Sequence, residues 1–433
     1  MQPTPPEESL KQKKKLLVVV SAVGVLAIAP SAALAQRAPA PPPPTFRWDD
    51  HPSIRFGRGT HIDFRARFST DVRRSDAPLP DEDIGAFDIA RRRIGVEGEI
   101  RNIVDFQIER ELISGTDGWR DVYVNYKQFD AAQVIAGKFK LPFSLDQNTS
   151  STNLDFIHRS LAASYLAPGR DIGVQVHGRV ANRILRYELG VFEHDGRNAR
   201  TNDPSRVTGG QTLAGRVRVE PFRHSKSSAR EFELGVAFTG SDVAEGFPGL
   251  RGRTVLDTAF FRPDYPVSGR RQRMGIEAQW RPGPFSVKSE WMRVRDERLA
   301  LSVEDSDLSP ITSEGWYVSG TWAVTGERKS SGLDTPRRPI FRGGYGAVEV
   351  AARVERLEFR SGTLGQTPST SPRADVIVGN GDRVVTIGAN WYLNRWLKVQ
   401  GNIIRESIDN PALGPLPSQK SFWSRIIRLQ LSI

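Results

Sequence analysis

The most constraining feature of this 433-residue sequence is an alternation of apolar and polar residues that recurs about sixteen times. The last run, residues 427–433, reads Ile-Arg-Leu-Gln-Leu-Ser-Ile and continues to the C-terminus. A period of two residues is typical of β-strands with one apolar and one polar face. Repeated on this scale behind an export signal, it predicts an all-β fold, a transmembrane antiparallel β-barrel of about 16 strands.

The N-terminus has the layout of a cleavable export signal. Four lysines between residues 11 and 15 precede an apolar run at residues 16–29, and Ala33-Leu34-Ala35 supplies the small residues that a signal peptidase requires. The apolar run is short for a bilayer span, although an N-terminal membrane anchor is the alternative. We predict a signal peptide at residues 1–35, a Pro-rich linker at residues 36–53 and an outer-membrane β-barrel at residues 54–433.

The connections between the runs support the barrel. The chain has no cysteine and a negative mean hydropathy, which by themselves would fit a soluble secreted protein. Tight turns nevertheless alternate with long Gly/Pro/Ser-rich stretches, as periplasmic turns and extracellular loops do in outer-membrane barrels. Only residues 327–343 are long where a short turn is expected. The predicted strands are at residues 54–68, 87–101, 103–113, 119–129, 131–141, 171–180, 184–193, 212–221, 231–241, 270–281, 285–295, 314–326, 344–357, 383–393, 396–406 and 422–433.

The inward face is expected to be rich in arginine. The chain has 49 arginines and a formal net charge of +11. A guanidinium binds oxyanions through a planar fork of donors, and rings of arginine in a narrow pore attract anions. Carboxylates of the same parity could instead neutralise the arginines, which would leave a weakly selective general porin. Strand parity predicts as pore-lining basic residues Arg65, Arg67, Arg93, Arg216, Arg218 and Arg273.

Other classes of function have less support in the sequence. The six histidines show no spacing typical of a zinc site or a Ser/His pair, so we predict no enzyme, no metal and no cofactor. The arginines follow strand parity without a helical basic motif, which argues against nucleic-acid binding. A non-conducting adhesin or structural barrel, with its loops at 242–269 and 358–382 as the working surface, stays open as an alternative.

Several blocks of the sequence carry a family resemblance. They are residues 91–98 (Arg-Arg-Arg-Ile-Gly-Val-Glu-Gly), 137–151 (Gly-Lys-Phe-Lys-Leu-Pro-Phe-Ser-Leu-Asp-Gln-Asn-Thr-Ser-Ser), 155–160 (Asp-Phe-Ile-His-Arg-Ser), 167–175, 315–318, 325–327 and 388–393. Together they resemble the phosphate-selective porin O and P family, from about residue 54 to the C-terminus. The resemblance implies a 16-stranded trimeric channel whose loop at about residues 142–170 folds into the lumen as an anion-binding constriction. At the matching anion-binding positions this chain has Arg91, Arg92, Ser150 and Arg159.

Two positions depart from the family pattern. Phosphate-binding members carry a lysine just before the Thr-Ser-Ser turn, where this chain has Gln147 and therefore one positive charge fewer. The chain also ends in Ile433, whereas substrates of the outer-membrane assembly machinery usually end in an aromatic residue.

The resemblance sets the expected function. It is passive diffusion of small inorganic anions, phosphate or polyphosphate above all, across the outer membrane of a Gram-negative-type cell. The expected partners are these anions, outer-membrane lipid and lipopolysaccharide, and further copies in a homotrimer. A structural alternative is that Arg91 and Arg159 only pin the loop to the wall, by pairing with Asp155, Asp121 or Glu97.

Overall fold

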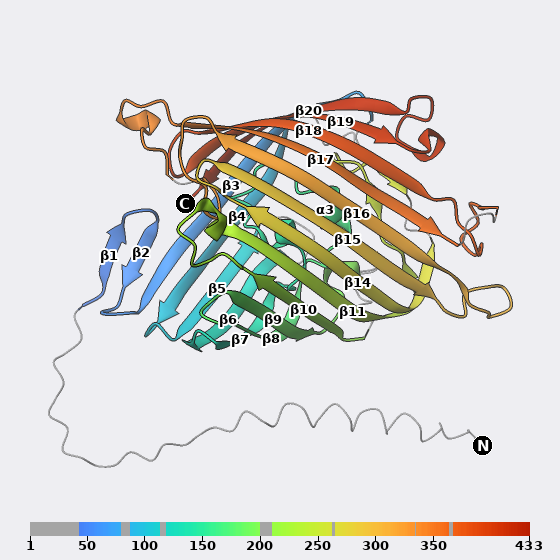
Figure 1. The fold of residues 1–433 in the computed structure, drawn as a ribbon, viewed down its shortest axis with the longest axis horizontal. Helices are drawn as coiled ribbons and strands as arrows, with labels where there is room; N and C mark the ends of the chain where they lie inside the picture. The colour runs from blue at the N-terminus through green and yellow to red at the C-terminus, as the bar shows by residue number, and fades with distance from the viewer. Residues whose placement is uncertain are drawn as a thin grey trace, which may run out of the picture. The chain divides into compact units, whose positions relative to one another are not determined.

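The alternating runs form a closed antiparallel β-barrel, which confirms the predicted fold class (Figure 1). The computed structural model describes residues 43–78, 87–112, 118–199, 210–261, 265–333, 335–362 and 367–433. Within these ranges sixteen strands pair in chain order, and β20 pairs back with β3. The strands are β3 (His61–Ser75), β4 (Phe87–Ile100), β5 (Val104–Glu111), β6 (Trp119–Phe129), β7 (Ala132–Lys140), β8 (Arg170–Val180), β9 (Leu185–Phe192), β10 (Thr212–Val219), β11 (Phe232–Pro248), β14 (Pro266–Trp280), β15 (Phe285–Arg298), β16 (Leu308–Ala323), β17 (Ala347–Ser361), β18 (Asn380–Tyr392), β19 (Leu397–Ile408) and β20 (Ser421–Ser432).

The two faces of the wall differ as the period of two requires. On β20, Ile427 and Leu429 are 58% and 45% exposed on the outer face, whereas Arg428 and Gln430 are 3% and 5% exposed on the inner face. The outer apolar side chains suit hydrocarbon, and the polar ones meet the lumen. In the described ranges no helix is long and apolar enough to cross a membrane.

The beginning of the barrel differs from the prediction. The predicted first strand, residues 54–68, is divided: β2 (Pro52–Arg55) pairs with β1 (Thr45–Trp48) in a hairpin, and the barrel wall starts at β3. The linker predicted at residues 36–53 is therefore too long, because its last part forms this hairpin. The predicted signal peptide and residues 36–42 lie outside the described residues.

The chain end completes the seam. The Ile433 N–H donates to the Ala66 carbonyl at 2.9 Å, and the Ala66 N–H donates to the Ile433 carbonyl at 3.1 Å. These bonds involve the backbone alone, so an aromatic side chain is not needed for them. The effect of Ile433 on assembly stays a prediction.

The connections alternate in length as expected, except that 220–231 is a second long connection at the tight-turn end, besides 324–346. Tight turns at 101–103, 130–131, 181–184 and 393–396 join strands at the end where the C-terminus lies (Figure 1). In the first, Arg101 and Asn102 have φ of 52° and 58°. The connections 220–231 and 324–346 are longer; they contain the 3₁₀ turns η2 (Ser228–Glu231) and η3 (Ile340–Arg342). The opposite, extracellular end carries longer loops with η1 (Gly196–Ala199), η4 (Pro411–Leu413) and the small sheet of β12 (Gly252–Arg253) and β13 (Ala259–Phe261).

The connection between β7 and β8 folds into the lumen, as the family resemblance implies. It contains two short helices, α2 (Leu145–Asn148) and α3 (Leu161–Tyr165). Phe143 and Leu161 of this loop are at most 1% exposed and pack in one apolar cluster with wall residues such as Met292. Each such side chain contributes about 1.5–3 kcal/mol when it is buried. The approach is close, because a Cβ at Gly315 of β16 would lie 2.8 Å from the Ala162 Cβ.

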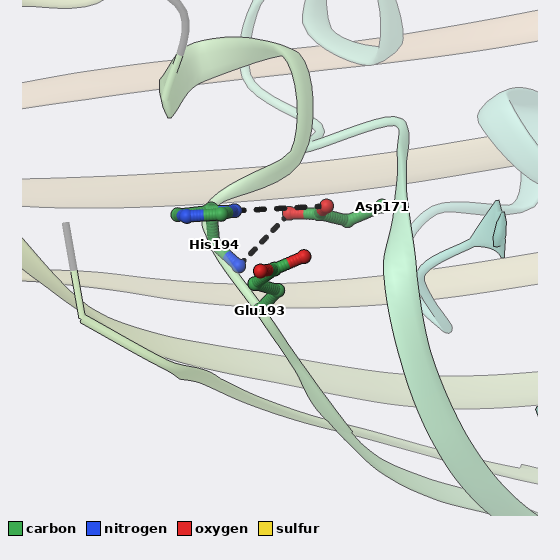
Figure 2. Close-up of side chains that lie close together, drawn as sticks. All are labelled: Asp171, Glu193 and His194. Carbon is green, nitrogen blue, oxygen red and sulfur yellow. Dashed lines mark hydrogen bonds and ion pairs between the residues drawn. The ribbon is translucent and has the colours of Figure 1, made fainter. Parts of the chain in front are cut away.

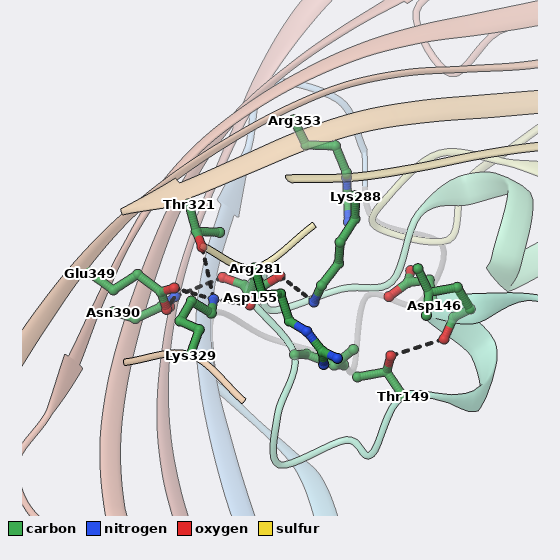
Figure 3. A network of polar contacts seen from close by, with 12 residues as sticks. Asp146, Thr149, Asp155, Arg281, Lys288, Thr321, Lys329, Glu349, Arg353 and Asn390 are labelled. Atoms are coloured by element: carbon green, nitrogen blue, oxygen red, sulfur yellow. Dashed lines mark hydrogen bonds and ion pairs between the residues drawn. The ribbon is translucent and has the colours of Figure 1, made fainter. Parts of the chain in front are cut away.

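An ionic network fastens the loop to the wall (Figure 3). The Asp155 carboxylate accepts hydrogen bonds from Lys288 Nζ and Lys329 Nζ, each at 2.7 Å, and Lys329 also pairs with Glu349. Lys329 comes from the connection 324–346, so the segment that broke the predicted alternation carries a cation into the barrel. Burial alone would raise the pKa of Asp155, but the two ammonium groups lower that pKa below its usual value.

Loss of the Asp155 charge should loosen the loop. The Asp155→Asn variant leaves two lysines facing a neutral amide inside the barrel, and breaking a buried ion pair costs about 3–5 kcal/mol. We expect a lower midpoint of thermal unfolding and frequent fluctuations in the single-channel current, because the loop then moves in the lumen. Circular dichroism on heating and planar-bilayer recording measure the two effects.

Asp130→Asn is the matched control. Asp130 pairs with Arg183 at 3.3 Å, and each side chain is 50% exposed. An exposed pair of this kind contributes about 0–1 kcal/mol, so this variant should behave as the parent protein. Equal behaviour of both variants would show that Asp155 does not hold the loop.

Candidate functional site

A cationic cavity lies between the inward loop and the wall formed by β3–β8. Its volume is about 400 Å³. Seven of the residues that line it are basic, whereas Asp121 is the only acidic residue among its lining in the described chain. The basic residues are Arg67, Arg91, Arg93, Lys140, Arg159, Arg170 and Arg197.

Three of these cations are compensated by wall carboxylates. Arg170 binds Asp121 through two hydrogen bonds, of 3.1 and 2.6 Å. Arg67 lies 2.9 Å from Glu109, and Arg93 lies 3.4 Å from the same carboxylate and also pairs with Glu111. These three guanidinium groups are therefore held in place by the wall and contribute little net charge to the cavity.

Two further cations are held by carbonyl oxygens instead of carboxylates. Lys140 Nζ donates to the Thr149 carbonyl at 3.1 Å. Arg197 donates to the carbonyls of Ala163 and Ala167, both at 3.0 Å. Burial lowers the pKa of Arg197 to about 10, which leaves it charged at neutral pH. A carbonyl orients a cation without neutralising it, so the charge of Arg197 stays available to an anion.

Arg91 has the least compensation in the cavity. Its Nη1 is buried and has no hydrogen-bond partner among the described residues. Its charged neighbours include Arg93, Arg159 and Arg428, while the nearby Asp71 already binds Arg428 at 2.6 and 2.7 Å. A buried donor without a partner costs free energy, which a bound anion would recover.

Arg159 holds the loop and faces the same cavity. It donates to the carbonyls of Asp146 and Thr149, the latter at 2.7 Å, and lies 3.9 Å from the Asp146 carboxylate. Burial lowers the pKa of Arg159, and Asp146 opposes that shift. The alternative that these arginines only pin the loop to the wall is therefore partly right for Arg159, although its acidic partner is Asp146 rather than Asp155, Asp121 or Glu97. It does not hold for Arg91.

The structure gathers three of the four predicted constriction residues. Arg91, Ser150 and Arg159 line the cavity together. Arg92 does not, because it is exposed and pairs in register with Phe68, which is 42% exposed on the outer face. Its assignment to the constriction is wrong: neighbouring residues of one strand point to opposite faces.

The predicted pore-lining arginines all face inward, and most are neutralised. Arg67 and Arg93 belong to the cavity. The remaining pairs are Arg65 with Glu97 at 2.9 Å, Arg216 with Glu277 at 2.6 Å, Arg218 with Glu188 at 2.9 Å, and Arg273 with Asp195 at 2.8 Å. Their charges support the wall more than they favour an anion.

Three basic residues and one hydroxyl of the cavity were not in the predicted site. Lys140 and Arg170 flank the loop and lie in sequence blocks that carried the family resemblance, so the sequence could have indicated them as site residues. Ser151 Oγ is buried without a partner among the described residues, and it is a better free hydroxyl than Ser150, which bonds Thr152 at 3.0 Å. Arg197 comes from a distant loop, and no sequence signal pointed to it.

A separate cluster contains Asp171, Glu193 and His194 (Figure 2). Potential ligand atoms of the three lie within 4.8 Å of one another. The Asp171 carboxylate, however, already accepts the backbone N–H groups of His194 and Gly196, both at 3.0 Å. The carboxylate thus fixes the start of the loop after β9.

Comparisons with known proteins agree with this architecture. The sequence pattern of the family described as "Phosphate-selective porin O and P" matches residues 62–413. Porin O of Pseudomonas aeruginosa is 22% identical over 332 residues, which cover 71% of this chain and 72% of the relative. An uncharacterized protein of Caulobacter vibrioides is 23% identical over 351 residues, 77% of this chain and 62% of that protein.

Solved structures show the same fold at low sequence identity. The trimer form of OmpT, an outer membrane protein of Vibrio cholerae, has a TM-score of 0.55 at 12% identity and covers 87% of this chain and 100% of its own. Salmonella typhi OmpF has a TM-score of 0.52 at 9% identity, covering 90% and 100%. The outer membrane channel DcaP of Acinetobacter baumannii has a TM-score of 0.52 at 10% identity, covering 87% and 98%. With the family pattern over most of its length and the fold of outer-membrane porins, the chain belongs to the phosphate-selective porin O and P family.

Proposed function

We propose that this outer-membrane porin selects small oxyanions, with inorganic phosphate as the best-fitting substrate. The anion enters the cavity between the loop and β3–β8 and meets guanidinium, ammonium and hydroxyl donors there. Such donors replace the hydration shell of the anion, and several partial contacts let it move onward. The proposal favours a channel over the enzyme and adhesin alternatives, in accord with the family.

The observation that carries the proposal is the buried Nη1 of Arg91, which has no hydrogen-bond partner among the described residues. Elsewhere in the described lumen the predicted arginines have carboxylates, but this one faces a cavity together with Lys140 and Arg197, which have only carbonyl partners. A site built this way is incomplete without an anion. Lys140 also compensates for Gln147, because its ammonium reaches the same Thr-Ser-Ser turn.

The selectivity can be measured on the refolded protein in a planar bilayer. A salt gradient gives the reversal potential, and phosphate added to chloride gives the block of the chloride current. We expect an anion-directed reversal potential and block by phosphate. A weakly selective current that phosphate leaves unchanged would instead identify a general porin.

The Arg91→Gln variant should bind phosphate more weakly. It removes a charged donor that has no other partner, and a charge-assisted hydrogen bond contributes about 1.5–3 kcal/mol. We therefore expect the half-blocking phosphate concentration to rise about tenfold or more. The chloride conductance should rise as well, because a weaker anion well holds each ion for less time.

Arg92→Gln is the control for that experiment. The two residues are adjacent on β4, and the substitution removes the same charge from the outer face. Phosphate block should keep its parent value in this variant. A similar change in both variants would mean that net charge, and not the cavity, determines the block.

The Gln147→Lys variant should bind phosphate more tightly. Gln147 is 7% exposed and lines the cavity, so a lysine there adds a charge next to the loop hydroxyls. We expect the half-blocking phosphate concentration to fall several-fold. Gln419→Lys, on an exposed extracellular loop, adds the same charge away from the cavity and should leave the block unchanged. No change in Gln147→Lys would exclude residue 147 from the anion path.

We also propose that the working form is a homotrimer surrounded by outer-membrane lipid and lipopolysaccharide. The family resemblance supports this assembly, and one of the similar structures is a trimer form. Native mass spectrometry of the detergent-solubilised protein should give a mass of three chains. A monomer at all detergent concentrations that preserve conduction would contradict the trimer.

A further inference from the structure

The outer face of the barrel carries arginines near the level at which the hydrocarbon core of the membrane is expected to end. Six of them lie on β18, β19, β20, β3, β4 and β5, each within about five residues of the strand end that leads to the extracellular loops. All six are exposed, and all share the strand parity of the apolar outer residues. We call this set the arginine belt: Arg383, Arg405, Arg425, Arg74, Arg92 and Arg110.

The belt is continuous across the strand register. Arg425 and Arg74 are direct partners across the β20–β3 seam. Arg405 is paired with Trp423, two residues from Arg425, and its guanidinium lies 5.6 Å from the centre of the Trp423 ring. Diagonal neighbours of this kind are about 7–8 Å apart, so one tetrahedral anion can contact guanidinium groups from two strands.

Carboxylates are few on this part of the outer surface: Asp76, just after β3, accepts the backbone N–H of Trp423 at 3.2 Å, and Asp409, just after β19, pairs with Arg356. Along these six strands, the described acidic residues face the lumen: Asp63, Asp71, Asp88, Glu97, Glu99, Asp105, Glu109, Glu111, Asp382 and Glu406. None of the six arginines has an ion pair with a described residue. Like charges that face one another across a strand pair destabilise the sheet unless a counter-charge intervenes.

The strands β15–β17 differ from the belt in the partners of their outward arginines. Three of their outward arginines near the same rim have acidic partners: Arg293 and Arg360 lie 3.3 and 3.0 Å from Glu314, and Arg356 lies 2.7 Å from Asp409. Arg295 of β15 is the exception, because it is exposed and has no ion pair with a described residue. Among the described residues, most outward arginines of β15–β17 at this rim therefore have an acidic partner, whereas those of the belt have none.

Resting on the outer-membrane lipid surroundings proposed above, we infer that the arginine belt binds the phosphate groups of lipid headgroups in the outer leaflet. Below the belt the outer face is apolar, with Ile387, Ile403 and Ile427 more than half exposed to the acyl chains. Long arginine side chains reach from such a surface to the headgroup level, and the guanidinium fork matches a phosphate in geometry and charge. The ligand is a phosphorylated lipid with several acyl chains, bound from the membrane side and independent of the lumen site.

Native mass spectrometry of the refolded protein with diphosphoryl lipid A tests this inference. The triple variant Arg74→Gln, Arg405→Gln, Arg425→Gln removes three charges from the belt. The control variant Arg58→Gln, Arg338→Gln, Arg342→Gln removes three exposed arginines from the opposite, periplasmic end. We expect the lipid concentration at half saturation to rise about tenfold or more in the belt variant, and to stay at the parent value in the control.

Two results would overturn the inference. One is equal binding of diphosphoryl lipid A by the belt variant and the parent. The other is a belt variant that keeps the lipid and changes the ratio of trimer to monomer, which would make the belt a contact between copies. If the variant does not fold, the parent protein still gives a test: it should prefer diphosphoryl over phosphate-free lipid A, and equal binding of the two would refute the site.

Discussion

The structure depends on the requirement that every backbone amide and carbonyl finds a partner within the chain where hydrocarbon replaces water. A closed ladder of sixteen described strands meets this requirement, and the seam between β20 and β3 is its critical point. Ile433 and Ala66 complete that seam with two backbone bonds. Once the ladder is closed, the parity of a residue decides whether its side chain meets lipid or lumen. The alternation of apolar and polar residues in the sequence follows from this division between lipid and lumen.

The lumen is divided between an apolar and a charged part. A wall that enclosed only water would have polar residues at its inward positions, yet Met292, Leu357 and Ile426 are buried there at 1% exposure or less. They pack against the inward loop, so one side of the barrel has a hydrophobic core like that of a soluble protein. The cavity remains on the side of β3–β8, where the inward residues are charged. Asp155 and its two lysines fix this division, because they hold the loop to the opposite wall.

The sequence could predict what depends on local pattern and little of what depends on distant contacts. The alternation of apolar and polar residues predicted the strands and most inward arginines, and the family resemblance predicted the inward loop. The error at Arg92 arose because a family block was transferred whole, although parity places Arg91 and Arg92 on opposite faces. Arg197 and Lys329 could not be predicted, because each lies in a connection whose path is determined only after the barrel closes. The predicted first strand, residues 54–68, runs across the turn between β2 and β3, because the hairpin β1–β2 has the same alternation as the wall.

Charge compensation distinguishes structural arginines from those that need a ligand. Arg428 and Arg170 each have a bidentate carboxylate, and their charge is used within the protein. Arg91 has no such partner, and it lies where water and ions have access. On the outer face the same reasoning applies to Arg425 and Arg74, which face each other across the seam and have no ion pair with a described residue. Because an arginine cannot lose its proton at any relevant pH, one without a carboxylate attracts external anions, and the face of the strand decides whether such an anion would come from the pore or from the membrane.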